Sequence, residues 1–212
     1  MATTIRSTIR STLRPVKIVH NGSKLNLYPP VLNDGNTVAW YDYLKADTIT
    51  KDGSNYVSRW NDKLGSGHDL IQSVGASQPI FTGDGILTDG IDDFMKAAAF
   101  TLNQPETIYL VAKVLSYVAL NHVCDGNTNE SGAIRLRAIN SAIAMAPTSS
   151  AEVSFNQSLF NIFKATFNGS SSKFSIMESA VTGNFGANNM GGFTLAKVGS
   201  SSVRYGNIIT KE

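Results

Sequence analysis

Short apolar runs alternate with turn residues along most of the chain. After residue 36, runs rich in Val, Ile, Phe and Tyr are separated by clusters of Gly, Asn, Asp and Ser. This spacing is typical of β-strands. The strands that we expect are residues 37–43, 70–74, 93–98, 107–118, 133–139, 159–167, 173–177, 192–198 and 207–210.

The local patterns agree with this interpretation. Residues 133–139 alternate apolar and polar positions, as a strand with one exposed face does. Asn168-Gly169 favours the tight turn of a hairpin. After Val31, no segment combines helical periodicity with capping residues over the length of a long helix. We therefore predict an all-β protein, either a two-sheet antiparallel sandwich or a barrel.

The composition supports the same fold class. The chain has 212 residues, of which 42% are hydrophobic and 16% are charged. The apolar fraction is enough for a sizeable core, which excludes disorder of the chain as a whole. The charged fraction is well below the roughly 25% of an average globular domain. The polar surface must then consist largely of Asn, Ser, Thr and Gly, which suit strands and turns and count against a helical bundle.

The N-terminal segment differs from the rest in charge and in pattern. Five basic residues and no acidic residue precede Asp34, whereas acidic residues outnumber basic ones in the remainder. A Thr-Ile-Arg-Ser repeat favours an extended arm over a helix because of its β-branched residues. The residues that we expect to anchor this arm to a partner are Ile5, Arg6, Ile9, Arg10, Leu13 and Arg14. The alternative is a disordered tail.

A domain boundary is expected near residue 30. Asn21-Gly22 predicts a short hairpin, and Tyr28-Pro29-Pro30 forms a stiff separator because each proline fixes φ. The predicted domains are residues 1–30, the basic arm and hairpin, and residues 31–212, the β-domain. The arm's repeat carries no aromatic residue for base stacking, and guanidinium groups bind carboxylates as well as phosphates. We therefore expect a protein partner rather than nucleic acid.

Cysteine content and hydropathy limit the cellular compartment that we expect for the protein. The single cysteine, Cys124, excludes a disulfide within the chain, and its apolar neighbour Val123 favours a buried thiol. No apolar stretch reaches the roughly 20 residues of a membrane-spanning helix. The N-terminus lacks the apolar segment of a secretory signal. We expect no membrane partner and assembly in a cytoplasm.

An ordered series of motifs in the first half of the β-domain suggests a family. The series is Val38-Ala39-Trp40-Tyr41-Asp42, Trp60-Asn61-Asp62, Gln78-Pro79 and Asp89-Gly90-Ile91-Asp92-Asp93-Phe94. It resembles the laminin-G-like, concanavalin A-like jelly rolls of phage structural and bacterial surface proteins. The resemblance implies a two-sheet antiparallel jelly-roll β-sandwich. In such domains the last strand runs further than Thr210, so an unpaired edge is expected at the C-terminal end.

The residues of these motifs are expected to serve the scaffold. Trp60 should bury its ring and donate its indole N–H to an acceptor. Asp62, Asp69, Asp92 and Asp93 stand at turns, where short carboxylates accept backbone N–H groups. We expect this structural role rather than contact with a ligand.

The sequence argues against catalysis. The resembling fold class includes glucanases, whose paired carboxylates lie two residues apart on one strand, and no glutamate here has an aspartate two positions later. His20, His68 and His122 lack metal-ligand spacing and are expected at the surface or in turns. No P-loop or nucleophile elbow is present. We predict that the protein is not an enzyme and has no catalytic residue.

One string imitates a calcium loop. Asp125, Asn127 and Asn129 stand at its first, third and fifth positions. Glu130 occupies the position that requires glycine, and Leu136 the position of the bidentate glutamate. We interpret the string as a hairpin loop, and we predict neither a metal nor a cofactor.

The features together favour a structural role. The first hypothesis is a non-enzymatic virion protein, such as a head-fibre, capsid-decoration or tail-associated protein. Its arm would bind other virion proteins, and its lectin-like domain would be displayed outward on the virion. The alternative is a carbohydrate-binding module, and the two are compatible if the domain binds host-surface glycans. We also expect a homo-oligomer, with a trimer favoured.

Overall fold

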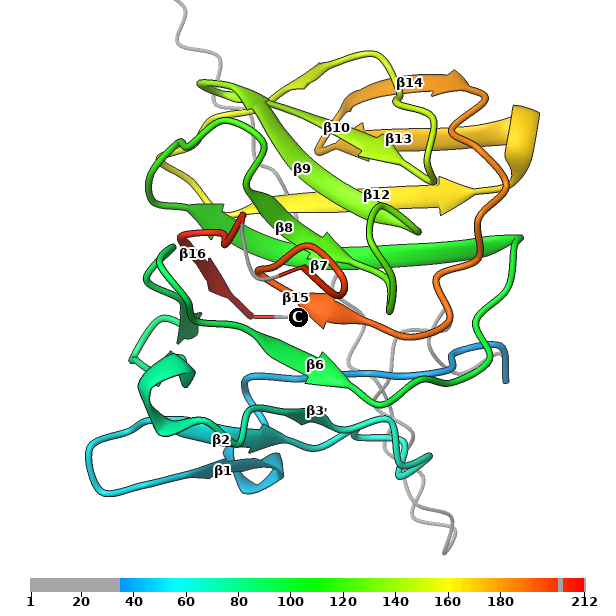
Figure 1. Ribbon diagram of the computed structural model, residues 1–212. Helices are drawn as coiled ribbons and strands as arrows, with labels where there is room; N and C mark the ends of the chain where they lie inside the picture. The colour runs from blue at the N-terminus through cyan, green and yellow to red at the C-terminus, as the bar shows by residue number, and fades with distance from the viewer. Residues whose placement is uncertain (1–34, 202–203, 212) are drawn as a thin grey trace, which may run out of the picture. The chain divides into compact units, whose positions relative to one another are not determined.

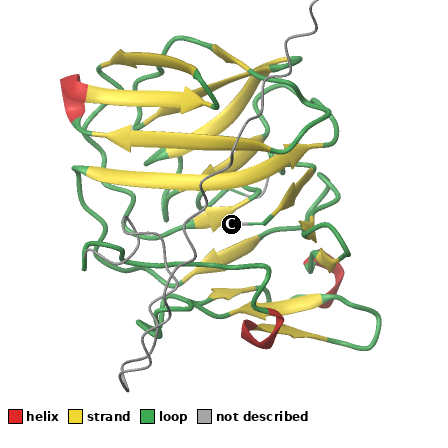
Figure 2. Ribbon diagram, turned by 180° about the vertical axis from the view of Figure 1, so that it is seen from behind, coloured by secondary structure: helices red, strands yellow, loops and turns green. Residues whose placement is uncertain are grey.

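The computed structural model describes residues 35–201 and 204–211. The chain divides into two units, Met1–Thr37 and Val38–Glu212. The second unit is an all-β sandwich of two antiparallel sheets, seen as two layers in Figure 1 and from behind in Figure 2. The arm and its six predicted anchoring residues lie outside the described residues.

The first sheet has nine strands in the order β1-β2-β3-β6-β15-β8-β9-β10-β11. In chain order they are β1 (Ile49–Lys51), β2 (Val57–Trp60), β3 (Leu70–Ile71), β6 (Met95–Ala97), β8 (His122–Asp125), β9 (Ala133–Ala138), β10 (Ser141–Met145), β11 (Val153–Ser154) and β15 (Thr194–Leu195).

The second sheet has seven strands in the order β14-β13-β12-β7-β16-β5-β4. In chain order they are β4 (Ile80–Phe81), β5 (Ile86–Leu87), β7 (Glu106–Val114), β12 (Asn161–Phe167), β13 (Ser172–Ile176), β14 (Ser179–Gly183) and β16 (Ile208–Thr210). Helical structure in the described residues is confined to three 3₁₀ turns: η2 (Ala46–Thr48), η3 (Gly75–Ser77) and η4 (Gly169–Ser171). None of these could cross a bilayer.

The core lies between the inner faces of the two sheets. Strand β7 alternates buried and more exposed residues along its nine positions, and β12 pairs with it in continuous register. Their inward side chains include Leu110 and Phe163, both essentially inaccessible to solvent. On the nine-stranded sheet, Ile134 and Leu136 of β9 face the same core. The fold therefore rests on the period-two burial that the sequence pattern predicts.

The structure corrects two of the predicted strands. Residues 37–43 form no strand, although Trp40 and Tyr43 are buried. The C-terminal strand β16 is not an edge, because it pairs with β7 on one side and β5 on the other. The predicted unpaired edge at this strand is therefore wrong.

The motif residues mostly serve the scaffold as expected. One carboxylate oxygen of Asp62 accepts the backbone N–H of Trp40 at 2.8 Å, and Asp69 accepts the N–H of Asp62 at 2.9 Å. Trp60 is buried, but its indole N–H has no acceptor among the described residues, contrary to the prediction. Cys124 is fully buried, as predicted.

Candidate functional site

The outer face of the nine-stranded sheet carries a row of chemically unusual residues. His122 of β8 lies opposite Arg135 of β9, which lies opposite Ile143 of β10. Because Ile134 and Leu136 point into the core, Arg135 and its cross-strand neighbours point away from it. An imidazole and a guanidinium group thus lie side by side on this face of the sheet.

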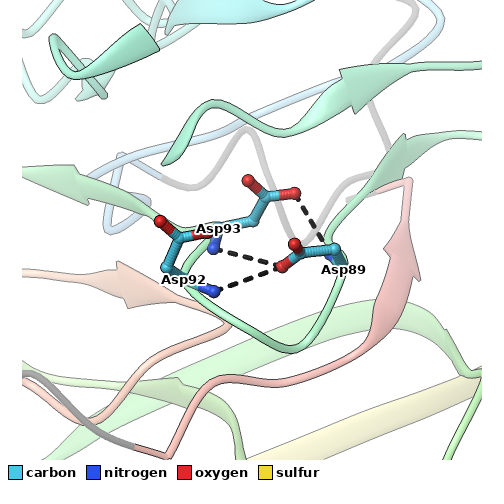
Figure 3. A group of neighbouring side chains, drawn as sticks. All are labelled: Asp89, Asp92 and Asp93. Carbon is cyan, nitrogen blue, oxygen red and sulfur yellow. Dashed lines mark hydrogen bonds between the residues drawn. The ribbon is translucent and has the colours of Figure 1, made fainter. Parts of the chain in front are cut away.

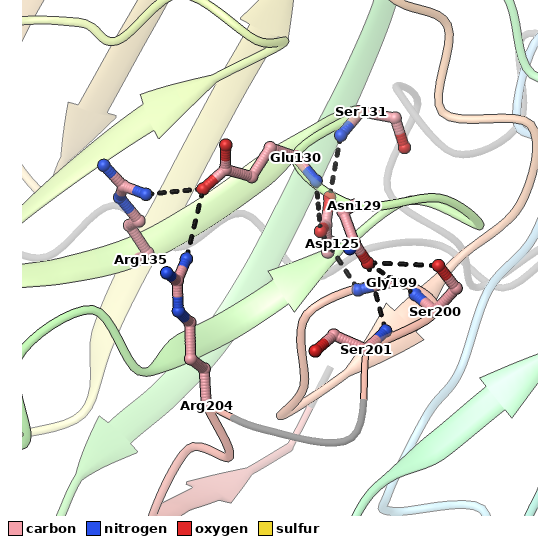
Figure 4. Close-up of polar contacts among 9 residues, drawn as sticks. All are labelled: Asp125, Asn129, Glu130, Ser131, Arg135, Gly199, Ser200, Ser201 and Arg204. Atoms are coloured by element: carbon pink, nitrogen blue, oxygen red, sulfur yellow. Dashed lines mark hydrogen bonds and ion pairs between the residues drawn. The ribbon is translucent and has the colours of Figure 1, made fainter.

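Glu130 joins two arginines at one end of this row. Its Oε1 atom lies 2.6 Å from Nη1 of Arg135 and 3.4 Å from Nη1 of Arg204, as Figure 4 shows. The Arg135 side chain is only 13% exposed, and its Nε atom is buried without a hydrogen-bond partner among the described residues. One carboxylate therefore faces two guanidinium groups, which leaves positive charge at this position.

The protonation of His122 is affected by this positive charge. Its side chain is fully buried, and neither ring nitrogen makes a hydrogen bond of good geometry with a described residue. Burial lowers its pKa to about 3, and the charges of Arg135 and Arg204 act in the same direction, against a smaller opposing effect of the Leu120 backbone. The imidazole is therefore neutral at pH 7. The prediction that His122 lies at the surface or in a turn is wrong.

A cavity of about 320 Å³ opens beside Arg135. Its lining combines side chains of β9 and β10 with the segment that leads into β11. Ile143, which is almost fully buried, provides an apolar part of the wall. The residues that line the cavity are Arg135, Arg137, Ile143, Ser149, Ser150, Ala151 and Glu152.

The polar groups of the cavity differ in how firmly they are held. Ser150 Oγ accepts the backbone N–H of Ala144 at 3.0 Å and donates to the Ala151 carbonyl at 2.7 Å, so its proton is not available to a ligand. Arg137 Nε and Glu152 Oε1 are 3.6 Å apart, and both side chains are about half exposed. An exposed ion pair of this length contributes little stability. A ligand can therefore replace either partner of the Arg137–Glu152 ion pair at a small cost in free energy.

Asp125 is a structural cross-link and not a calcium ligand. Its two oxygens accept four backbone N–H groups, from Gly126, Glu130, Ser131 and Gly199, at 2.7–3.1 Å. Figure 4 shows the contacts with Glu130, Ser131 and Gly199. Asn129 extends this link by accepting the N–H groups of Ser200 and Ser201. Burial raises the pKa of Asp125 to about 6, although these four N–H groups oppose the shift. Hydrogen-bond donors occupy the positions where a cation would need oxygen ligands.

A second acidic group lies in the turn before β6. Atoms of the Asp89, Asp92 and Asp93 carboxylates lie within 4.8 Å of one another (Figure 3). Asp89 Oδ1 accepts the N–H groups of Ile91, Asp92 and Asp93, while Asp93 accepts the N–H of Asp89.

These contacts assign the acidic turn to the scaffold. Asp92 accepts the hydroxyl of Ser77 at 2.9 Å, and burial with the adjacent carboxylates raises the pKa of Asp93 to about 7. The prediction of a turn carboxylate that accepts a backbone N–H is confirmed for Asp93, whereas Asp92 accepts a side-chain hydroxyl and Asp89 accepts most of the N–H groups of the turn.

Sequence reasoning identified the strand of the site but not the site. The alternation in residues 133–139 predicted that Arg135 and Arg137 share one face of a strand. Nothing in the sequence indicated that His122, Glu130, Glu152 and Arg204 lie around them, because these residues come from separate loops and strands. The structure brings none of the predicted arm residues into this site, since they lie outside the described part.

The fold and the site define a two-sheet β-sandwich with a charged cavity on one outer face. No family model and no curated protein match this chain. Among solved structures, the chain is similar to the Trypanosoma rangeli sialidase in complex with sialic acid, with a TM-score of 0.54 and 10% sequence identity. The match covers 77% of this chain and 29% of the sialidase chain. At this identity the likeness shows the fold alone.

Proposed function

We propose that this domain is a carbohydrate-binding β-sandwich of the jelly-roll, concanavalin A-like type, and that the cavity beside Arg135 is its binding site. The single observation that carries the proposal is the lining of this cavity. Its volume of about 320 Å³ lies at the lower end of the range for small-ligand pockets, roughly 300–1,000 Å³.

The lining suits a ligand covered with hydroxyl groups. Arg135 and Arg137 supply only donors, Glu152 supplies an acceptor, and Ser149 offers a hydroxyl that can do both. Ala151, which is exposed, offers a small apolar surface for the C–H groups of a sugar ring. This mixture of oriented polar groups and a small apolar patch is the general composition of small-molecule sites.

We further propose that the domain binds carbohydrate without cleaving it. One neighbour by fold is a sialidase, so hydrolysis is the competing function. Glycoside hydrolysis requires two carboxylates placed for acid and base or nucleophile roles. Here Glu152 lies beside Arg137 and accepts the Ser141 hydroxyl, while Glu130 is shared by two arginines. Both carboxylates are thus engaged by arginines, and this supports binding over catalysis.

Virion display through residues 1–30 stays a prediction from the sequence. It is compatible with the proposed activity, since a displayed domain that binds carbohydrate would contact host-surface glycans.

A glycan array probed with the full chain tests the proposed function. Ala151→Trp places a large side chain at the rim of the cavity, where Ala151 is exposed, and should abolish concentration-dependent binding. Ala76→Trp, at an exposed position in η3, is the matched control and should bind as the wild type does. A blank array, or equal binding by both variants, would contradict the proposal. Release of sugar from a bound glycan would contradict its non-catalytic part.

A further inference from the structure

The charge around the cavity is unbalanced. Three guanidinium groups, of Arg135, Arg137 and Arg204, face two carboxylates, of Glu130 and Glu152. The imidazole of His122 adds no charge, because it is neutral at pH 7. The site therefore carries a net positive charge before any ligand binds, which favours an anion over a neutral molecule.

The two arginine side chains of the cavity differ in how tightly they are held. Arg135 is held by Glu130 at 2.6 Å and is largely buried, so its guanidinium is fixed in place. Arg137 lies 3.6 Å from Glu152, and its side chain is 52% exposed. A planar guanidinium that is weakly paired at the mouth of a cavity is well suited to bind an incoming carboxylate through two parallel hydrogen bonds.

The lining also lacks the usual means of binding neutral sugars. Among the described residues, no aromatic side chain lines the cavity, so none of them supplies binding energy there by ring stacking. Ionic hydrogen bonds are about twice as strong as neutral ones and can replace it. The composition of the lining thus indicates a ligand with its own charge.

We propose that the ligand of this cavity is an acidic sugar whose carboxylate is bound by Arg137, with Arg135 supplying a fixed positive charge beside it. The inference rests on the proposed carbohydrate-binding function and adds the chemical class of the ligand. Two kinds of sugar carry such a carboxylate, the uronic acids and the nine-carbon sialic acids. They differ in ring substituents and share the group that Arg137 would recognise.

Calorimetric titration of the full chain tests the proposal with pairs of ligands that differ only in whether the carboxylate is free or methyl-esterified. The methyl glycoside of N-acetylneuraminic acid is compared with its carboxyl methyl ester, and digalacturonic acid with its dimethyl ester. We expect at least one acid to bind at least 10-fold more tightly than its ester, and the stronger acid identifies the source. Raising the salt concentration from 50 to 500 mM should weaken binding of the acid more than that of the ester.

A pair of matched variants assigns the effect to Arg137. Arg137→Gln should weaken binding of the preferred acid at least 10-fold and leave binding of its ester unchanged. The control is Arg59→Gln, because Arg59 lies on the same sheet with a similar exposure of 49% and a similar ion pair, 3.5 Å from Asp69. This variant should bind the acid within twofold of the wild type.

The outcomes separate this inference from the proposed function. Equal affinity for acid and ester, with both blocked by Ala151→Trp, would overturn the acidic ligand and leave carbohydrate binding intact. Equal losses in Arg137→Gln and Arg59→Gln would overturn the role of Arg137. No binding of any sugar, charged or neutral, would overturn the proposed function itself.

Discussion

Replacing His122 with leucine tests the electrostatics of the site directly. The imidazole is fully buried on β8, next to Arg135, and neither ring nitrogen makes a hydrogen bond of good geometry with a described residue. Leucine has a similar volume and removes the two unpaired polar atoms. We therefore expect His122→Leu to be as stable as the wild type or up to about 2 kcal/mol more stable at pH 7.

The larger effect is expected in acid. Burial and the neighbouring guanidinium groups lower the pKa of His122 from 6.5 to about 3. A lowered folded-state pKa means that the unfolded chain binds the proton more tightly. The stability due to neutral His122 is thus complete above pH 6.5 and is lost as the pH falls toward 3. The difference of about 3.5 pH units corresponds to about 5 kcal/mol of unfolding free energy.

Urea denaturation of both proteins between pH 7.5 and 3.5 measures this difference. Groups with raised pKa values, among them Asp125, stabilise the fold as the pH falls and act in the opposite direction. Their contributions are shared by the two proteins and cancel in the comparison. The variant should therefore gain about 1.4 kcal/mol on the wild type for each pH unit below 6.5. If the unfolding free energies of the two proteins changed in parallel with pH, the lowered pKa of a buried imidazole next to two arginines would be refuted.

Two further predictions concern buried carboxylates. Asp125→Ala leaves four backbone N–H groups without their acceptor. The substitution should therefore lower the unfolding free energy, measured by urea denaturation, by about 3–5 kcal/mol. A loss below about 1 kcal/mol would contradict the cross-linking role of this carboxylate. Burial raises the pKa of Glu106 from 4.5 to about 7, so its stabilising contribution is present below pH 4.5 and lost as the pH rises through 7. Glu106→Gln should reduce the fall in stability between pH 5 and 8 by up to about 3 kcal/mol, and an unchanged pH profile would contradict this.

The longer strands that the sequence predicted share one property. Strands β7, β9, β12 and β13 have alternating apolar and polar residues or long β-branched runs, and all four were expected. Strands β8 and β10 were not, because every residue in each is buried and no alternation remains to mark them. Residues 37–43 gave the opposite error: Trp40 and Tyr43 are buried, but the segment joins no sheet.

The candidate site could not be predicted from the sequence for a related reason. A strand pattern specifies which residues share a face, so it placed Arg135 and Arg137 together. The pattern cannot specify which loops pack against that face. Glu130, Glu152 and Arg204 reach the two arginines only because their segments pack there. The same holds for Asp125, whose calcium-like spacing is local while the N–H of Gly199 reaches it from 74 residues away.

The sequence by itself determined the all-β class, the turn-forming role of the aspartates and the buried thiol of Cys124, because periodicity, turn propensity and local polarity are properties of neighbouring residues. Only the tertiary structure decided that β16 is internal, that His122 is buried beside two arginines, and that a charged cavity forms between β9, β10 and the segment before β11. These features depend on contacts between residues far apart in the chain. Their energies arise from burial and charge, which exist only once the sheets have packed.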